Sequence, residues 1–190
     1  MAAGKNFVCS LFCKLGWISI DADKLVHSAI KKAEPQILAT FLPYAQNKGI
    51  TLTNADGSLN RRELGRLIFP EPSLLQMQEQ IIYPIIIDET KAFIASNAQK
   101  NIILNATVLY KTPELLSLCK YIVYVTAPKI IRFFRARKRD NMPFKQILSR
   151  FKSQKKLFLK YKEFNIPVYK LTNTSNKTEK KVLQLIKFLK

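Results

Sequence analysis

The chain has 190 residues and a mass of 21.9 kDa, enough for one domain with a substantial hydrophobic core. Hydrophobic residues make up 47% and charged residues 24%, a composition that excludes collagen, disordered chains and disulfide scaffolds. The 32 Lys and Arg against 13 Asp and Glu give a net charge of +19, so we expect an anionic partner: nucleic acid, a nucleotide, a phosphorylated metabolite or acidic membrane.

Signals for export or membrane insertion are weak. The longest apolar run, residues 81–87, is far shorter than the roughly 20 residues that a bilayer-spanning helix needs. Cys13 and Lys14 stand where a signal peptide would carry small residues, so we expect none. The cysteines lack a CxxC spacing and His27 is the one histidine, which predicts neither a disulfide framework nor a zinc site. We expect a cytoplasmic protein with no membrane partner, and Cys9, Cys13 and His27 in its core.

Helical and strand patterns alternate in the first half of the chain. Gly16 is well placed to end the first helix, and Pro84 is expected to interrupt the last one. The predicted elements are a helix over 7–15, a strand over 17–20, a helix from about residue 23, a mixed stretch over 35–60 with a turn at 54–57, and helices over 60–69 and 74–97.

The second half continues the alternation. Its predicted elements are strands over 101–106 and 121–126, helical segments over 129–162 with a break at 141–143, a strand over 166–171 and an amphipathic helix over 180–189. Residues 129–162 hold 13 Lys and Arg against one acid, Asp140. The alternation predicts an α/β fold with a parallel sheet.

Residues 2–7 are a candidate phosphate-binding loop. Such a loop needs glycine where the backbone approaches phosphate, amide groups at a helix N-terminus and a lysine that reaches the β- and γ-phosphates. Gly4 and Lys5 supply the second half of the motif directly before the first helix. Asn6 stands where Ser or Thr would offer a hydroxyl to Mg²⁺.

Two carboxylates, Asp21 and Asp23, follow the first predicted strand. One interpretation is a helix cap, in which Asp23 accepts backbone N–H bonds. The other is catalytic, because open α/β sheets bind ligands at this end of a strand, and a carboxylate there can accept a hydroxyl proton during phosphoryl transfer.

Arg132, Arg135 and Arg139 have spacings that place them on one face of a helix. Their guanidinium groups suit phosphate oxygens, although a solvated basic face is the alternative interpretation.

Taken together in chain order, these segments resemble the dephospho-coenzyme A kinase family. The matching segments are Gly4-Lys5 with its helix, Leu15-Gly16, Ile20-Asp21-Ala22-Asp23, residues 57–69, Ile81-Ile-Tyr-Pro84, Ile102 to Tyr110, Val123-Tyr-Val-Thr-Ala127, Arg132, Arg139-Asp140 with the run to Arg150 and Gln154, and Asn173. The resemblance covers nearly the whole chain. It implies a three-layer P-loop NTPase fold of the nucleoside-kinase type, in one domain over 1–190, with a helical acceptor-binding region over 30–97 and a basic lid over 129–162.

The family pattern is incomplete in this chain. Tyr83 replaces the histidine of a His-Pro pair, Thr107-Val108-Leu109 replaces Pro-Leu-Leu, and Asn6 replaces the P-loop Ser or Thr. The family's first strand and leading glycine are absent from the sequence. We therefore expect the native reading frame to start upstream, with about ten more residues that end in a glycine-containing turn.

The resemblance implies transfer of the γ-phosphoryl group of ATP to the 3′-hydroxyl of dephospho-coenzyme A, with Mg²⁺ and without nucleic acid. The implied site residues are Lys5, Asp23 and Arg139 for catalysis; Ala2, Ala3, Gly4, Lys5, Asn6, Phe7, Arg132 and Asn173 for ATP; Asp21, Arg61 and Tyr83 for the acceptor; and Asn6 for the metal. Two alternatives stay open: a nucleic-acid-binding protein that uses the basic segment 129–162, and an inactive kinase of the same fold.

Overall fold

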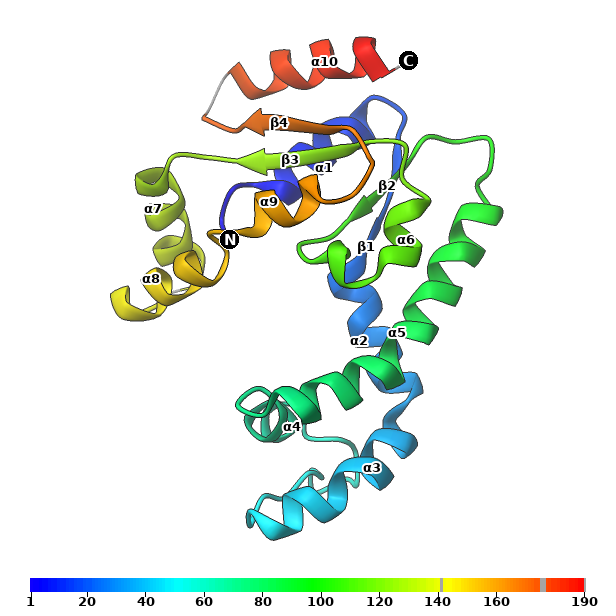
Figure 1. Ribbon diagram of the computed structural model, residues 1–190, viewed down its shortest axis with the longest axis vertical. Helices are drawn as coiled ribbons and strands as arrows, with labels where there is room; N and C mark the ends of the chain where they lie inside the picture. The colour runs from blue at the N-terminus through cyan, green and yellow to red at the C-terminus, as the bar shows by residue number, and fades with distance from the viewer. Residues whose placement is uncertain (141, 175–176, 190) are drawn as a thin grey trace. The chain divides into compact units, whose positions relative to one another are not determined.

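The computed structural model describes residues 1–140, 142–174 and 177–189, which form two compact units. Unit 1 comprises Met1–Ile20 together with Ala98–Lys190, and unit 2 comprises Asp21–Asn97 (Figure 1). The helical region expected over 30–97 lies within unit 2, and the basic segment 129–162 lies within unit 1. No helix among the described residues is long and apolar enough to cross a membrane.

Unit 1 is an α/β assembly. Its elements are α1 (Lys5–Lys14), β1 (Ile18–Asp21, whose last residue begins unit 2), β2 (Ile102–Asn105), the short 3₁₀-helix η1 (Leu109–Lys111), α6 (Pro113–Ser117), β3 (Ile122–Thr126), α7 (Lys129–Asp140), α8 (Phe144–Ser153), α9 (Leu157–Lys162), β4 (Val168–Thr172) and α10 (Lys177–Leu189). β1 pairs with β2, and β3 pairs with β4 in parallel, from Ile122 opposite Val168 to Thr126 opposite Thr172. All five predicted elements of this second half are present, and the α/β class is confirmed. Asn141, inside the predicted break, lies outside the described residues.

The core of unit 1 joins its first and last helices to the strands. α1 and α10 pack together, and their apolar faces meet the inner residue of β4. The buried members of this cluster are Val8, Leu11, Phe12, Leu171, Val182 and Ile186. Trp17 covers one edge, with its ring 5.2 Å from that of Phe12 in a T-shaped arrangement. Since the core holds the middle of α1 through Val8, Leu11 and Phe12, it fixes where the N-terminal loop lies.

Unit 2 is helical, with α2 (Ala22–Lys32), α3 (Glu34–Asn47), α4 (Arg61–Ile68) and α5 (Pro72–Ala95). Asn60 begins α4 as its N-cap, since its side chain accepts from the Glu63 N–H at 3.2 Å. The predicted turn at 54–57 is confirmed by the Gly57 N–H bond to the Asn54 carbonyl at 3.0 Å.

One expectation about unit 2 was wrong, because a proline can be accommodated on an exposed helix face. The stretch at 35–60 is mixed as expected, since α3 fills its first part and a loop with a turn its second, but α5 continues through Pro84. Proline at a helical position removes the hydrogen bond to the carbonyl four residues earlier. Both Pro43 with Ala39 and Pro84 with Gln80 are exposed, so water can satisfy those carbonyls. The buried stripes on the opposite faces then hold each helix together.

One buried group in unit 2 lacks a partner. Leu74, Gln78, Ile82 and Ile86 form a buried stripe at four-residue spacing along α5. Gln78 is 3% exposed, and neither its amide nitrogen nor its amide oxygen has a hydrogen-bond partner among the described residues. An unsatisfied buried amide destabilises the folded state by its desolvation free energy.

We therefore expect Gln78→Leu to raise the free energy of unfolding by about 1–3 kcal/mol, because leucine removes the unsatisfied amide at similar volume. Urea or thermal unfolding would measure the change. Gln76→Leu is the matched control, since Gln76 is exposed on the same helix and its substitution should change little. A Gln78→Leu protein that is less stable than the parent would contradict the prediction.

Candidate functional site: a phosphate-binding loop beside a cationic helix

The N-terminus of α1 carries no side-chain cap among the described residues. Gly4 precedes the helix with a φ of 89°, in the left-handed region, and its carbonyl accepts the Val8 N–H at 3.0 Å. No described side chain caps this end, so the N–H groups of the first turn are directed out of it. Their partial positive charge adds to the helix dipole, an arrangement that favours bound phosphate.

Asn173 holds the loop before α1. Its Nδ2 donates to the Ala3 carbonyl at 2.8 Å, and its Oδ1 accepts from the Thr178 hydroxyl at 3.1 Å. Its own N–H donates to the Thr126 carbonyl at 2.7 Å, which ties it to the end of β3. A Cβ added at Gly4 would lie 2.0 Å from the Asn173 Nδ2. The Asn173 amide, expected to contact ATP, therefore already bonds the backbone of the loop.

Lys5 and Asn6 are linked to the end of β2 through Asn105. The Lys5 ammonium donates to the Asn105 carbonyl at 3.5 Å, and the Asn105 Nδ2 donates to the Asn6 Oδ1 at 3.1 Å. Because an amide oxygen has two lone pairs, Asn6 keeps one with which it could bind a cation. The described residues contain no group of three carboxylate, His or Cys side chains that could hold a metal. This donor set fits Mg²⁺ held mainly by phosphate and water, as the ion is commonly bound.

The arginines of α7 face the loop. The Arg132 Nε donates to the Met1 carbonyl at 2.9 Å, and the Arg135 guanidinium donates to the Ala3 carbonyl at 3.4 Å. Burial, followed by the charges of Arg132 and Arg139, lowers the pKa of the Met1 amino group to about 5. The predicted common face of these arginines is thus confirmed for Arg132 and Arg135, and the potential beside the loop is positive.

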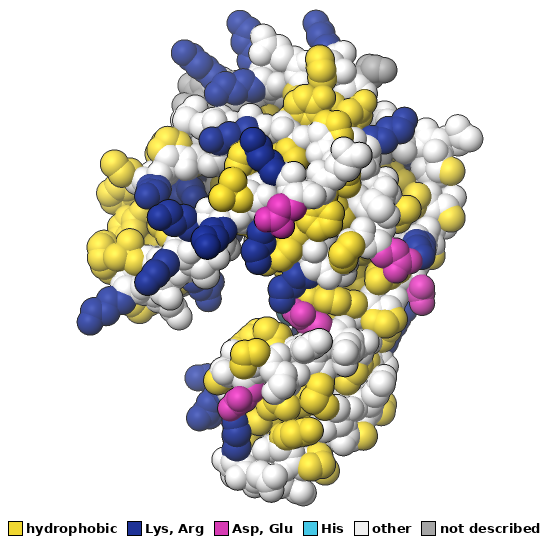
Figure 2. All heavy atoms as spheres, viewed as in Figure 1, with side chains coloured by type: hydrophobic (Ala, Val, Ile, Leu, Met, Phe, Trp, Pro, Cys, Tyr) yellow, Lys and Arg dark blue, Asp and Glu magenta, His cyan; other side chains and the backbone are white. Residues whose placement is uncertain are grey.

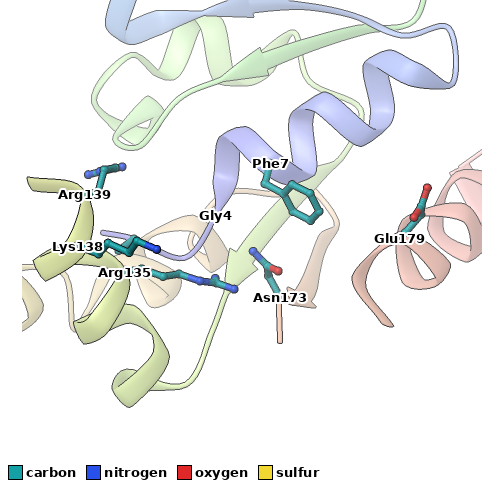
Figure 3. A pocket seen from close by; sticks show the side chains of 8 residues that line it. Gly4, Phe7, Arg135, Lys138, Arg139, Asn173 and Glu179 are labelled. Atoms are coloured by element: carbon teal, nitrogen blue, oxygen red, sulfur yellow. The ribbon is translucent and has the colours of Figure 1, made fainter. Parts of the chain in front are cut away.

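A cavity of about 830 Å³ opens between the loop, α7 and the start of α10, all within unit 1 (Figure 3). It is lined by Ala2, Gly4, Phe7, Arg135, Lys138, Arg139, Asn173 and Glu179. Three cations face one carboxylate, and Figure 3 shows Glu179 on the far side of Phe7 and Asn173 from the α7 side chains. The size and charge of the cavity suit a phosphorylated small molecule.

In unit 2, Asp21 and not Asp23 is the capping residue of α2. The Asp21 Oδ1 accepts the Asp23 N–H at 2.9 Å. This corrects the capping interpretation, which assigned the acceptor role to Asp23. The Asp23 side chain is exposed in the first turn of the helix, directly after the strand β1. Asp21 is therefore positioned by the helix start, whereas the Asp23 carboxylate is accessible to solvent.

Arg61, from the start of α4, meets His27 of α2. Its guanidinium donates to the His27 Nδ1 at 2.7 Å, so that nitrogen carries no proton when the bond forms. His27 is exposed, contrary to the expectation of a core histidine, and Cys13 is half-buried, whereas Cys9 is buried as expected. Tyr83 is half-buried on α5. The candidate acceptor residues thus all belong to unit 2, and the candidate ATP residues all belong to unit 1.

Three residues of the site were missed in the sequence. Asn105 is the last residue of β2 and lies near the carboxyl end of the strand predicted over 101–106, so its polar side chain there was an available signal. Lys138 was hidden among the many cations of residues 129–162. Glu179 lies in a lysine-rich segment and carries no motif, so only the tertiary structure brings it to the cavity.

Comparisons of the sequence with a family model and with curated relatives point to the same family. The family model described as Dephospho-CoA kinase matches residues 1–174. A dephospho-CoA kinase of Treponema pallidum is 35% identical over 90% of this chain and 82% of its own length. A dephospho-CoA kinase of Treponema denticola is 34% identical over 97% of this chain and 85% of its own length.

Solved structures share the fold. The Thermus thermophilus protein TT1252 has a TM-score of 0.79 at 21% identity, over all of this chain and 91% of its own. A dephospho-CoA kinase from Campylobacter jejuni has a TM-score of 0.70 at 21% identity, and the match covers 100% of this chain and 92% of that structure's chain. The P-loop NTPase fold expected from the sequence is thereby confirmed, and the nucleic-acid-binding alternative is not favoured. A loop shaped for phosphate, a cationic helix beside it and these matches over at least 90% of the chain agree: the chain belongs to the dephospho-CoA kinase family.

Proposed function

We propose that this kinase transfers the γ-phosphoryl group of ATP to the 3′-hydroxyl of dephospho-coenzyme A. The observation that carries the proposal is the uncapped N-terminus of α1, with Gly4 and Lys5 beside a cavity lined by three cations. The names of the curated relatives supply the acceptor.

Unit 1 would hold ATP. The loop amides from Ala3 to Phe7 would bind the β- and γ-phosphates, with the Lys5 ammonium on their oxygens. Arg132 supports the loop from behind, since its guanidinium bonds the Met1 carbonyl. Arg139, exposed on α7 and lining the cavity, would neutralise charge that develops on the transferred group. Asn173 would act by holding the loop.

Unit 2 would supply the acceptor side of the reaction. The Asp23 carboxylate would take the proton of the 3′-hydroxyl as that oxygen bonds to the γ-phosphorus and the bond to the β-phosphate oxygen breaks, which releases ADP. Asp21 would position the ribose, while Arg61 and Tyr83 would contact the anionic and apolar parts of the acceptor. Residues 30–97 would thus form the acceptor-binding region, and residues 129–162 the basic lid.

Mg²⁺ would be held by Asn6 together with the phosphates, and when bound it neutralises phosphate charge. Asn6 keeps one lone pair of its Oδ1 for this purpose, since Asn105 occupies the other. We also propose a reducing compartment such as the cytoplasm, because no disulfide joins Cys9, Cys13 or Cys119 among the described residues.

The proposal is tested by incubating the full chain with ATP, Mg²⁺ and dephospho-coenzyme A, and separating the products by chromatography. We expect coenzyme A and ADP in equal amounts, and no product when EDTA removes the metal. ATP hydrolysis without phosphorylated acceptor, or intact substrates after long incubation with a folded protein, would overturn the proposal and favour an inactive kinase.

A further inference from the structure

The outer surface of α7 and α8 exposes large apolar side chains. Ile130 and Phe134 on α7 are 72% and 65% exposed, and Phe144 and Leu148 on α8 are 55% and 47% exposed. The Phe133 ring connects the two helices, because its centroid lies 5.7 Å from that of Phe134 and 5.3 Å from that of Phe144. We call Ile130, Phe134, Phe144 and Leu148 the apolar patch.

This patch lies on the side of α7 away from the phosphate-binding loop. Ile130, Phe134 and Arg137 share one helical face by their spacing, and Arg132 and Arg135 occupy the opposite face, where they bond the loop. The patch therefore does not belong to the cavity described above, and binding there leaves the loop face of α7 uncovered.

Cations surround the patch. Lys129, Arg137, Lys145 and Lys152 are exposed on the same two helices, and Figure 2 shows hydrophobic side chains gathered with Lys and Arg over this part of the molecule. The whole segment 129–162 holds 13 Lys and Arg and one acid. An apolar face bordered by Lys and Arg on a helix is the pattern of interfacial helices that lie on anionic membranes.

We propose that the apolar patch docks this enzyme on an anionic lipid surface, with its four side chains among the acyl chains and the bordering cations at the headgroups. A second copy of the chain is disfavoured, because association through the patch would bring cationic surfaces of two +19 molecules together. Nucleic acid is disfavoured because only Phe134 and Phe144 of the four patch residues offer rings for base stacking, whereas the aliphatic side chains of Ile130 and Leu148 would gain no stacking partner. Contact of this kind needs no membrane-spanning helix, and it would revise the expectation from the sequence that the protein has no membrane partner.

Flotation of the full chain with phosphatidylglycerol–phosphatidylcholine vesicles tests the proposal, with pure phosphatidylcholine vesicles in parallel. We expect binding to the anionic vesicles that weakens as salt is raised, and little binding to the neutral ones. The double variant Phe134→Ser with Leu148→Ser should reduce the partition coefficient by about tenfold or more. Phe69→Ser is the matched control, since Phe69 is 73% exposed at the end of α4, outside the patch, and should bind like the parent.

Several results would overturn the inference. Unchanged binding of the folded double variant would mean that the Lys and Arg charges alone hold the protein on the vesicles, without the apolar patch. Absence of vesicle binding by the parent protein would exclude a lipid surface as the partner. Tighter binding of a single-stranded oligonucleotide than of vesicles, reduced in the double variant, would identify nucleic acid as the occupant. A dimer in analytical ultracentrifugation that the double variant abolishes would identify a second copy. Thermal melting of each variant confirms that it is folded.

Discussion

Asp23→Asn is expected to lower kcat by about 10²–10⁴-fold, the range that a general base contributes. The Asp23 carboxylate is exposed in the first turn of α2, and the backbone bond there runs from its N–H to the Asp21 Oδ1. Asparagine keeps the size of the side chain and the backbone bond, but it cannot accept the hydroxyl proton. The loss should therefore fall on kcat, with KM for ATP little changed.

Steady-state kinetics with varied dephospho-coenzyme A and ATP measure this effect. Asp88→Asn removes an exposed carboxylate from α5 in the same unit and should leave both constants near those of the parent. Asp21→Asn is a variant of the neighbouring carboxylate. It retains a side-chain oxygen that can accept the Asp23 N–H, so α2 stays capped and the fold is preserved. If Asp23→Asn kept more than about a tenth of the parent kcat, Asp23 would not be the base.

Gly4→Ala should have the largest structural consequence in the loop. A Cβ at this position would lie 2.0 Å from the Asn173 Nδ2, and alanine would also be strained at a φ of 89°. Relief of the clash requires loss of the Asn173 bond to the Ala3 carbonyl. The strain of about 1–2 kcal/mol and the lost hydrogen bond of about 1 kcal/mol together predict a stability loss of about 2–3 kcal/mol.

The same movement displaces the loop amides, so ATP should bind at least about tenfold more weakly. Thermal unfolding and calorimetric titration with ATP measure the two effects. Gly16→Ala is a closely matched control, because Gly16 has a φ of 88° but nothing within 4 Å of an added Cβ. It isolates the backbone strain from the clash, and it should leave ATP binding unchanged.

A second substitution tests whether the clash with Asn173 causes the stability loss of Gly4→Ala. Asn173→Ala removes the group with which the new Cβ would collide, so the Gly4→Ala and Asn173→Ala effects on stability should be strongly non-additive. Additive effects would show that Asn173 does not fix the loop. Equal stability losses in Gly4→Ala and Gly16→Ala would lead to the same conclusion.

Local patterns in the sequence identified most helices and strands correctly. The spacing of apolar residues correctly predicted the positions of α1, α4, α10 and the strands β1–β4. Each of these elements packs apolar side chains at regular spacing against the rest of its own unit. The same reasoning failed at Pro84, where α5 continues without a break. Proline counts as a helix breaker in isolation, yet an exposed carbonyl four residues earlier makes it tolerable.

The sequence by itself determined the fold class, the family and the types of group available: Gly4 and Lys5 before a helix, paired aspartates after a strand, and arginines at helical spacing. These features depend on neighbours a few residues apart, which periodicity and motif order record. Only the tertiary structure decided what the side chains contact. Asn173 bonds Ala3 from 170 positions away, Asn105 bonds Asn6 from 99 positions away, and Glu179 reaches the cavity without any motif. Such pairs form when strands and helices pack, because hydrogen-bond partners are set by proximity in space, which local sequence patterns do not encode.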